Sequence, residues 1–361
     1  MATVSRRSEM AEATSSITIP VLLLGCGGVG RHLLHHIVAC RDLHSKMGLV
    51  LRVVGVSDSR SLLLVDDVAT TGFEDEFLTE IFRLKSSSGS SFSDLHDLGR
   101  CQLVKGAEVT TNIINVAGQL GKSTGLSVVD CTASPETVHI LNKVIDFGCC
   151  IILANKKPLT CRIEDYDKLI SNIRRIRFEA TVGAGLPIIA SITRVLGSGD
   201  PIYRIIGSLS DPRDDLSGMD VARKALILAR LLGWRIDMDD IQVESLYPKE
   251  LGPNSMSTED FLRIGMLSLD RGIQERANAA SSRNKVLRYV CVIKESRCQV
   301  GLQELPKDSP LGRLRGSDNV VEIYSRCYNK SPMVIQGAGA GNDTTAAGVL
   351  ADIVDLQDLF H

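Results

Sequence analysis

An α/β fold with two separate sheets is the architecture that this sequence predicts, and three observations support it. Apolar runs of strand length alternate with helical patterns in the first half of the chain, and a glycine-rich turn follows the first of these runs. Strands of alternating polarity appear again near the C-terminus, as in a second sheet. The length of 361 residues is sufficient for two domains, each with its own core.

Composition excludes several classes of protein. The net charge is -2 and aromatic residues make up 4%, so neither a basic surface nor stacking platforms for nucleic acid are expected. No apolar run approaches the ~20 residues of a membrane-spanning helix. The ten cysteines have no C-x-x-C pair and no zinc-ligand spacing, which favours free thiols in a reducing compartment. Residues 1–16 are polar and predict a disordered lead; we expect a cytoplasmic protein, with a plastid location left open.

The first apolar run, residues 17–24, leads directly into Gly25-Cys-Gly27-Gly-Val-Gly30 and then into a helical pattern over residues 31–39. This order of strand, glycine turn and helix is the context that a dinucleotide-binding G-x-G-x-x-G motif requires. Gly25 permits the tight turn, Gly27 lets the backbone approach a pyrophosphate, and Gly30 brings helix and strand close together. Because the helix N-terminus faces the phosphates, the motif predicts a Rossmann-type NAD(P)-binding domain, to which we assign residues 17–177.

The second strand, residues 49–56, ends next to Asp58 and Arg60. An acidic residue at this place accepts the ribose hydroxyls of NAD, whereas a nearby arginine can receive the 2′-phosphate of NADP. The presence of both leaves the cofactor preference open. Further along, Thr132 follows the strand 126–130 and Lys156 follows the strand 149–154, at the sheet edge where open α/β folds bind their ligands.

The sequence pattern changes after Arg177. Residues 178–189 read as strand, glycine turn and helix start; the carbonyls of this turn, with Glu179, could hold a monovalent cation, although the spacing favours a tight packing turn. Strands at 203–210, 286–293 and 319–325 predict a second, α+β domain over residues 178–333. The segment 334–361 is predicted to be a glycine-rich turn and a helix that return to the nucleotide domain.

Residues 211–224 place four aspartates, two arginines and a lysine before an apolar helical run. The turn chemistry predicts a helix start between Ser217 and Met219, which puts Asp220 and Lys224 at i and i+4 on one face. A carboxylate and an ammonium near a helix start can bind an amino-acid zwitterion or deliver a proton to a carbonyl oxygen. The alternative is an ordinary solvated pair on a helix surface.

The sequence is similar over residues 19–356 to the homoserine dehydrogenase family, in its monofunctional form without a fused aspartate kinase. The resemblance implies NAD(P)H-dependent reduction of L-aspartate 4-semialdehyde to L-homoserine, on the route to threonine and methionine, and a homodimer. It also implies that the α+β domain over residues 178–333 serves in substrate binding and dimerisation. The motifs that carry it, in chain order, are Gly25-x-Gly27-x-x-Gly30, Ala154-Asn-Lys156, the stretch from Glu179 to Pro187, the stretch from Asp211 to Lys224, and Gln336-Gly-Ala-Gly-Ala-Gly341.

The resemblance also implies roles for individual residues. It makes Lys224 the proton donor, Lys156 a second active-site lysine beside the nicotinamide, and Asp220 and Asp215 substrate-site residues. It also implies a sodium site, in place of the packing turn favoured by spacing. The nucleotide-side residues are Gly25, Gly27, Gly28, Val29, Gly30, Asp58, Arg60, Thr132, Lys156 and Gly341, and the sodium ligands are Glu179, Val182, Ala184 and Leu186.

One departure from the family pattern lies between Ser210 and Asp211, which are adjacent here. Members of the family carry a helical excursion at this joint, including a glutamate that binds the substrate's amino group and part of the subunit contact. Two hypotheses follow: an active homoserine dehydrogenase, or a nucleotide-binding variant of the family, as from alternative splicing, with impaired catalysis.

Overall fold

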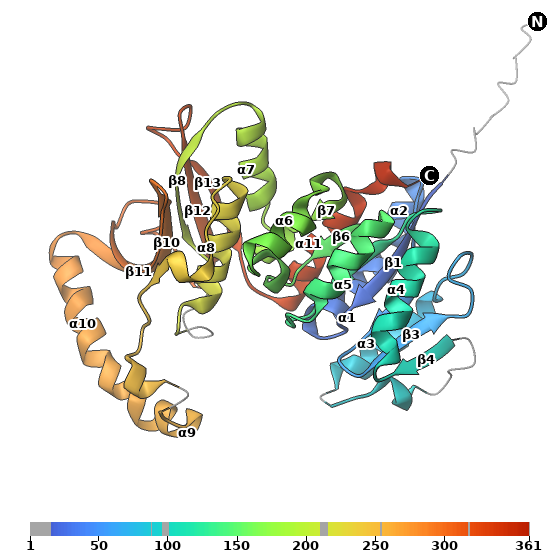
Figure 1. The fold of residues 1–361 in the computed structure, drawn as a ribbon. Coiled ribbons are helices and arrows are strands. Elements are labelled where there is room, and N and C mark those ends of the chain that lie inside the picture. Colours follow the sequence, from blue (N-terminus) through green and yellow to red (C-terminus); the bar gives the residue numbers. More distant parts are fainter. Residues whose placement is uncertain are drawn as a thin grey trace, which may run out of the picture.

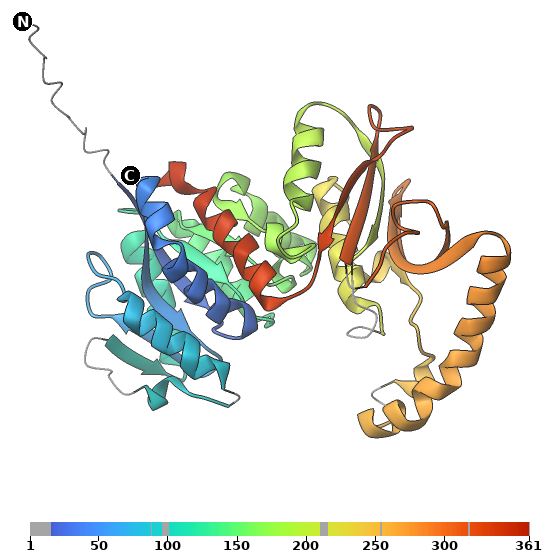
Figure 2. The same ribbon diagram turned by 180° about the vertical axis from the view of Figure 1, so that it is seen from behind.

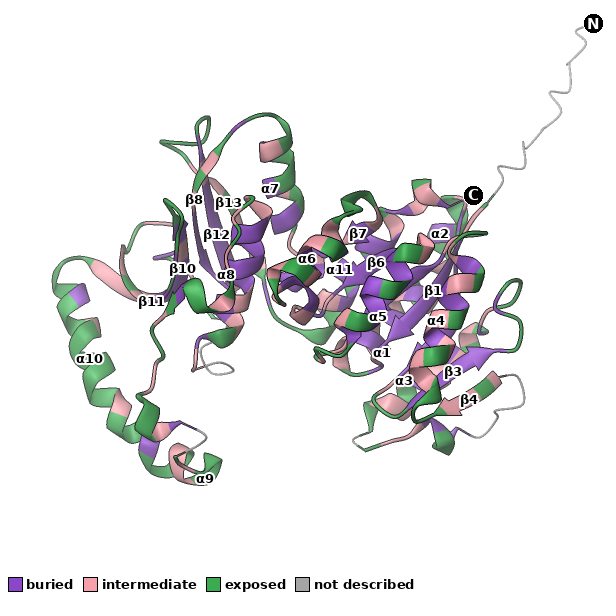
Figure 3. Cartoon of the chain, viewed as in Figure 1, coloured by how far each residue is buried: buried purple, intermediate pink, exposed green. Residues whose placement is uncertain are grey.

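A computed structural model describes residues 16–87, 89–95, 101–209, 216–252, 255–316 and 318–360. Two sheets lie side by side, each with helices packed against it (Figures 1 and 2). This arrangement confirms the predicted α/β fold class with a Rossmann-type sheet and a second, α+β part. The strands of both sheets are largely buried (Figure 3).

The first sheet has the strand order β4-β3-β2-β1-β5-β6-β7. The strands from β2 to β7 in this order run parallel, whereas β3 and β4 add an antiparallel edge that the sequence analysis did not predict. Its strands are β1 (Ile17–Leu24), β2 (Leu49–Ser57), β3 (Ser61–Val65), β4 (Cys101–Lys105), β5 (Ser127–Asp130), β6 (Cys150–Leu153) and β7 (Ile176–Arg177).

Helices around the first sheet bury an apolar stripe against it, as Leu33, Leu34 and Ile37 of α1 illustrate. The last helix of the chain, α11, packs against α1, so the predicted return of the C-terminal segment to the nucleotide side is observed (Figure 2). The helices are α1 (Gly28–Ala39), α2 (Arg41–Lys46), α3 (Asp75–Ser86), α4 (Glu108–Leu120), α5 (Thr137–Val144), α6 (Ile163–Ile170) and α11 (Asn342–Val354).

The second sheet has the order β13-β12-β8-β10-β11-β9. The sequence predicted a glycine-rich turn from residue 334, but this segment begins with β13, which pairs antiparallel with β12. Its residues are alternately half-buried and exposed, as is typical of an edge strand. The strands are β8 (Ile202–Ser208), β9 (Ile241–Val243), β10 (Lys285–Lys294), β11 (Arg297–Pro306), β12 (Asp318–Ser325) and β13 (Met333–Ala338).

Two of the helices beside the second sheet, α7 (Ile188–Gly197) and α8 (Met219–Leu231), bury apolar residues; α9 (Thr258–Asp260) and α10 (Met266–Ser282) extend away from both sheets (Figure 1). Helix α8 starts where the turn chemistry predicted. Its buried residues include the charged Lys224 and Arg230, so the alternative of an ordinary solvated helix pair is wrong. Within the described part of the chain, no helix has the length and apolar character needed to cross a membrane.

The buried carboxyl of Asp352 connects α11 to the turn Glu179–Thr181, in which Glu179 is half-buried. Oδ2 of Asp352 accepts a hydrogen bond from the Glu179 amide at 3.0 Å, and the Glu179 carboxylate accepts bonds from the Ile189 and Ala190 amides at the start of α7. Burial, and then the neighbouring Glu179 carboxylate, raise the pKa of Asp352 to about 8. The helix that returns to the nucleotide side is therefore tied to the turn that precedes α7.

This pair predicts a pH dependence of stability. Because the folded-state pKa of Asp352 lies above its unfolded value of 3.8, the group's stabilising contribution is complete below that value and is lost as pH rises through about 8. Asp352→Asn keeps an acceptor for the Glu179 amide but cannot ionise. Equilibrium urea unfolding should show that the variant loses less stability than wild type between about pH 5 and 8, the difference being at most about 1.4 kcal/mol per pH unit.

The matched control is Asp358→Asn, which changes an exposed carboxyl in the turn after α11. Its pH profile should follow that of wild type. Parallel profiles for wild type and Asp352→Asn would contradict a buried, protonated Asp352.

Candidate active site

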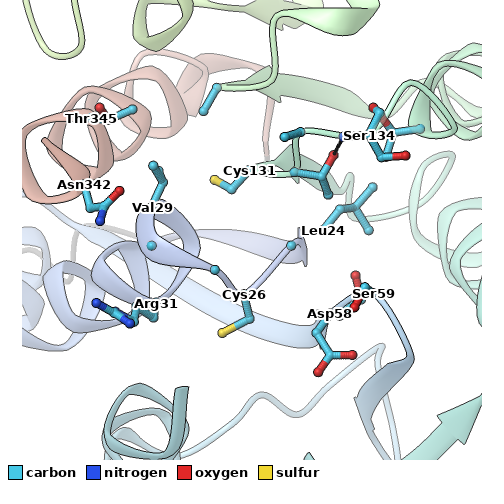
Figure 4. Close-up of a pocket in the computed structure, with 18 of the residues that line it drawn as sticks. Leu24, Cys26, Val29, Arg31, Asp58, Ser59, Cys131, Ser134, Asn342 and Thr345 are labelled. Carbon is cyan, nitrogen blue, oxygen red and sulfur yellow. Dashed lines mark hydrogen bonds between the residues drawn. The ribbon is translucent and has the colours of Figure 1, made fainter. Parts of the chain in front are cut away.

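A cavity of about 1730 Å³ opens along the carboxyl end of the first sheet and reaches the start of α8. Figure 4 shows Asp58 and Ser59 on one side of the glycine turn and Asn342 and Thr345 of α11 on the other. Predicted site residues that line it are Gly25, Gly27, Gly28, Val29, Asp58, Arg60, Thr132, Lys156, Ala184, Asp220 and Lys224. Gly341 lies between Ala340 and Asn342, which also line it, and Asp215 is outside the described residues.

The glycine turn has the geometry that its motif requires. Gly25 has φ +89°, and a Cβ there would lie 2.9 Å from the Thr132 backbone nitrogen; a Cβ on Gly30 would lie 2.0 Å from the Gly25 carbonyl oxygen. Gly27, by contrast, faces open space, with nothing within 4 Å of an added Cβ. Helix α1 begins at Gly28 without a side-chain cap, so its first amides point into the cavity as an anion site.

Beside the turn, Asp58 is held by its neighbours. Its Oδ1 accepts hydrogen bonds from the Arg60 amide and from Ser61, and its Oδ2 pairs with Lys85 Nζ at 3.0 Å. Burial favours the neutral carboxyl, but the Arg60 amide and the Lys85 ammonium together hold the pKa of Asp58 below its ordinary value. The predicted ribose acceptor is thus already ion-paired.

Two more cations border this place. Arg60 is exposed at the cavity edge, and Nη1 of Arg31 donates to the Lys85 carbonyl at 2.9 Å while its Nε is buried without a partner. Lys85 comes from the end of α3, far along the chain, and no sequence motif marked it. The cavity near the β2 end therefore carries more positive charge than Asp58 and Arg60 alone indicated.

A buried polar network joins the ends of β5 and β6. Nδ2 of Asn155 lies within hydrogen-bond distance of Asp130 Oδ2, the Thr132 and Thr137 hydroxyls and the Ser134 carbonyl. Asp130 Oδ1 accepts from the amide and hydroxyl of Thr132. Buried polar groups satisfied in this way fix local geometry, so Thr132 and the following Lys156 are held on one rigid edge.

Lys156, Asp220 and Lys224 meet at the other end of the cavity. Asp220 Oδ1 lies 3.2 Å from Lys156 Nζ, and its Oδ2 lies 2.9 Å from Lys224 Nζ. Lys224 also donates to the carbonyl of Leu209, at the end of β8, and only 8% of the residue is exposed. Lys156, from the segment after β6, and Lys224, from α8, therefore share one carboxylate.

Burial and neighbouring charges shift the pKa values of Asp220 and Lys224. Burial lowers the pKa of Lys224, and the Lys156 ammonium lowers it further against the opposing pull of Asp220. For Asp220, burial favours the neutral form, yet the two ammonium groups outweigh it and hold its pKa below the ordinary value. An ammonium with a lowered pKa, facing a cavity, is suited to donate a proton to an oxygen that becomes negative.

Several of the predicted sodium ligands already accept hydrogen bonds. The two oxygens of the Glu179 carboxylate accept hydrogen bonds from amides of α7, at 2.6 and 2.7 Å. The Glu179 and Leu186 carbonyls accept hydrogen bonds from the Val182 and Ile188 amides. The Ala184 carbonyl oxygen would lie 2.9 Å from a Cβ on Gly348 of α11, so a helix backbone covers it. No cluster of three or more His, Cys, Asp and Glu suited to a metal occurs among the described residues. The sodium site stays a prediction of the sequence.

The fold and the site together define a two-sheet α/β protein with a dinucleotide-type cavity and an amine–carboxylate triad. The family model described as homoserine dehydrogenase matches residues 207–354. Over this range the chain is similar to the homoserine dehydrogenase family.

Individual relatives agree. A homoserine dehydrogenase from Paracoccidioides brasiliensis is 29% identical over 394 positions, covering 96% of this chain and 100% of the relative. A bifunctional aspartokinase/homoserine dehydrogenase from Haemophilus influenzae is 29% identical over 379 positions and 95% of this chain, which spans only 43% of that longer protein.

Solved structures show the same fold. A Candida auris protein of unknown function matches with TM-score 0.80 and 27% identity, covering 96% of this chain and 99% of that one. A hyperthermophilic archaeal homoserine dehydrogenase in complex with NADPH matches with TM-score 0.67 and 20% identity, covering 96% and 99% of the two chains.

Substitution of Gly27 and of Gly30 should have different effects, one on cofactor binding and the other on stability. Gly27→Ala should leave stability unchanged but weaken NADPH binding, because its methyl group enters the space that a pyrophosphate would occupy. Gly30→Ala should lower the free energy of unfolding by about 1–3 kcal/mol through its clash with Gly25. Calorimetric NADPH titration and urea unfolding of both variants separate the effects; equal loss of stability in both would contradict this geometry.

Proposed function

We propose that this chain reduces L-aspartate 4-semialdehyde to L-homoserine with a nicotinamide cofactor, and catalyses the reverse oxidation. One observation carries the proposal: the triad of Lys156, Asp220 and Lys224 shares a single cavity with the glycine turn. The match to the family model described as homoserine dehydrogenase, and the similarity to a homoserine dehydrogenase over its whole length, support the same reaction.

When bound, the nicotinamide supplies the hydride that adds to the aldehyde carbon. Negative charge then develops on the carbonyl oxygen, and the Lys224 ammonium stabilises this charge and gives its proton to that oxygen. Asp220 holds Lys224 in place at 2.9 Å and keeps it protonated, while the second ammonium, Lys156, lies at the nucleotide side of the same carboxylate. The low exposure of Lys224 excludes water from the proton transfer.

We propose NADPH as the preferred cofactor. Lys85 neutralises Asp58, and Arg60 and Arg31 stand beside it, so this edge offers a cationic setting for a 2′-phosphate. A structurally similar archaeal homoserine dehydrogenase was solved in complex with NADPH, which agrees with this choice.

The remaining elements of the proposal concern organisation. We propose a nucleotide domain over residues 17–177, a substrate domain over 178–333 and a C-terminal segment over 334–361, with a homodimer as the working assembly. A cytoplasmic location is supported by the cysteines, which form no disulfide among the described residues. The sodium ion has no part in the proposed mechanism.

We propose further that this chain lacks a segment at the Ser210–Asp211 joint, which lies outside the described residues. The alignment with the Paracoccidioides protein runs over 394 positions but uses 96% of 361 residues, so that relative has positions with no counterpart here. If purified protein binds NADPH but does not oxidise it in the presence of aspartate semialdehyde, the impaired, nucleotide-binding variant is the correct reading.

Substitution of Lys224 tests the mechanism. Lys224→Met should lower kcat for aspartate semialdehyde reduction by about 10²–10⁴-fold, the range of general acid catalysis, and leave NADPH affinity nearly unchanged. In wild type, reduction should decline as pH rises through a value below the ordinary lysine pKa of 10.5, because the protonated amine is the active form. Lys168→Met, at an exposed lysine, is the control. Loss of NADPH binding in Lys224→Met would show that the residue has a different role.

Cofactor preference is tested at Asp58 and Lys85. Asp58→Asn keeps the Oδ1 acceptor for the Arg60 and Ser61 amides but removes the charge, so it should weaken NADH more than NADPH. Lys85→Met should do the opposite, because it removes a cation beside the 2′-phosphate. Dissociation constants for both cofactors measure the effect, and equal changes for NADH and NADPH in both variants would refute these roles.

A further inference from the structure

Arg230 is a buried guanidinium on α8 that the proposed chemistry does not use. Its side chain is 0% exposed, and it lies on the same helix as Asp220 and Lys224. Nη1 donates to the Leu159 carbonyl at 2.8 Å, Nη2 donates to the Cys161 carbonyl at 2.9 Å, and Nε donates to the Ile236 carbonyl at 3.1 Å. The first two bonds connect α8 to the segment between β6 and α6, and the third binds the chain just after α8.

The bound loop is the one that begins with Lys156. The Leu159 amide donates to the Lys156 carbonyl at 3.1 Å, and the Thr160 hydroxyl donates to the same carbonyl at 3.0 Å. Thr160 stands between the two residues whose carbonyls Arg230 binds. The Lys156 carbonyl is therefore hydrogen-bonded to the segment 159–161, whose carbonyls bind Arg230.

Helix α8 and the Lys156 loop contact each other in two places. Lys156 Nζ lies 3.2 Å from Asp220, near the start of α8, and Arg230, near the end of the same helix, donates to the carbonyls of Leu159 and Cys161 in the loop. A loop carrying an active-site lysine is thus attached to the catalytic helix at two points, one through the side chain and one through the backbone.

The Arg230 guanidinium has enough partners to remain charged although it is buried. Asp237 Oδ1 lies 2.6 Å from Nη2, and the guanidinium carbon stands 4.7 Å from the centre of the Tyr166 ring. A buried guanidinium is tolerated only when its donors are paired, and here they are paired mainly with main-chain carbonyls of fixed position. Because the guanidinium is planar and its donors have fixed directions, it holds these carbonyls in place more firmly than the flexible ammonium of a lysine would.

We propose that Arg230 is a positioning residue for the reduction: it sets the place of Lys156 against Asp220 and Lys224 by anchoring the 156–161 loop to α8. This inference rests on the proposed function. Without Arg230, the loop loses its backbone attachment and Lys156 draws away from Asp220. Lys224 then loses a repelling ammonium, so its pKa rises and the alkaline limit of the reduction moves to higher pH.

Arg230→Met is the test, with Arg288→Met as the matched control. Arg288, on β10, likewise donates to three backbone carbonyls, those of Leu311, Gly312 and Leu314, but these belong to a loop beside the second sheet. Arg230→Met should lower kcat by about 10–100-fold, the effect of a misplaced catalytic group, with NADPH affinity unchanged and the alkaline limit shifted upward. Arg288→Met should change stability without shifting that limit, and Arg230→Lys, which keeps a donor, should recover part of kcat.

A measurement without substrate separates this inference from the proposed function. Hydrogen exchange of the Leu159 and Thr160 amides should accelerate in Arg230→Met and not in Arg288→Met. If wild type has no turnover, the proposed function fails, and this exchange result still decides whether Arg230 anchors the loop. Unchanged exchange in Arg230→Met, or a kcat loss with no shift of the alkaline limit, would overturn the proposal.

Discussion

The site depends on one carboxylate that serves two ammonium groups. Asp220 lies 3.2 Å from Lys156 and 2.9 Å from Lys224; Lys156 follows β6 of the first sheet, and Lys224 is on α8 beside the second. Two like charges in a buried place repel each other, and a shared anion offsets this repulsion only while all three groups stay close. The active geometry therefore requires that the two halves of the molecule be held in register, and much of the surrounding structure does this.

Three attachments maintain that register. Arg230 ties α8 to the Lys156 loop, Asp352 ties α11 to the turn that precedes α7, and α11 itself packs against α1 beside the glycine turn. Arg230 and Asp352 are buried side chains that bond to backbone groups, so the geometry of these two attachments is set by main chain rather than by rotamers. The chain reaches the first sheet, leaves it for the second and comes back, and the return helix completes the nucleotide side of the cavity.

Local chemistry explains what could be predicted from the sequence. The glycine turn is a contiguous motif whose conformation follows from its residues, and the start of α8 follows from the turn residues before it. Lys85 and Arg230, by contrast, gain their roles only from partners far along the chain, Asp58 and Leu159, and a single lysine or arginine in a helical pattern carries no sign of that. The Glu179 turn is a similar case. The motif indicated a cation site, but it could not predict that the Glu179 carboxylate accepts hydrogen bonds from the amides of α7, because no local pattern specifies where that helix lies.

The joint between Ser210 and Asp211 lies next to the proton donor. Leu209 is the last described residue before it, and the Leu209 carbonyl accepts a hydrogen bond from the Lys224 ammonium. Leu216 is the first described residue after it, and the Leu216 carbonyl accepts a hydrogen bond from the Leu246 amide shortly before α8 begins. The described residues on the two sides of the joint therefore contact the proton donor or lie close to its helix. A segment missing here, as we propose, would act on the surroundings of Lys224, even though the lysine, its aspartate and the glycine turn are all retained.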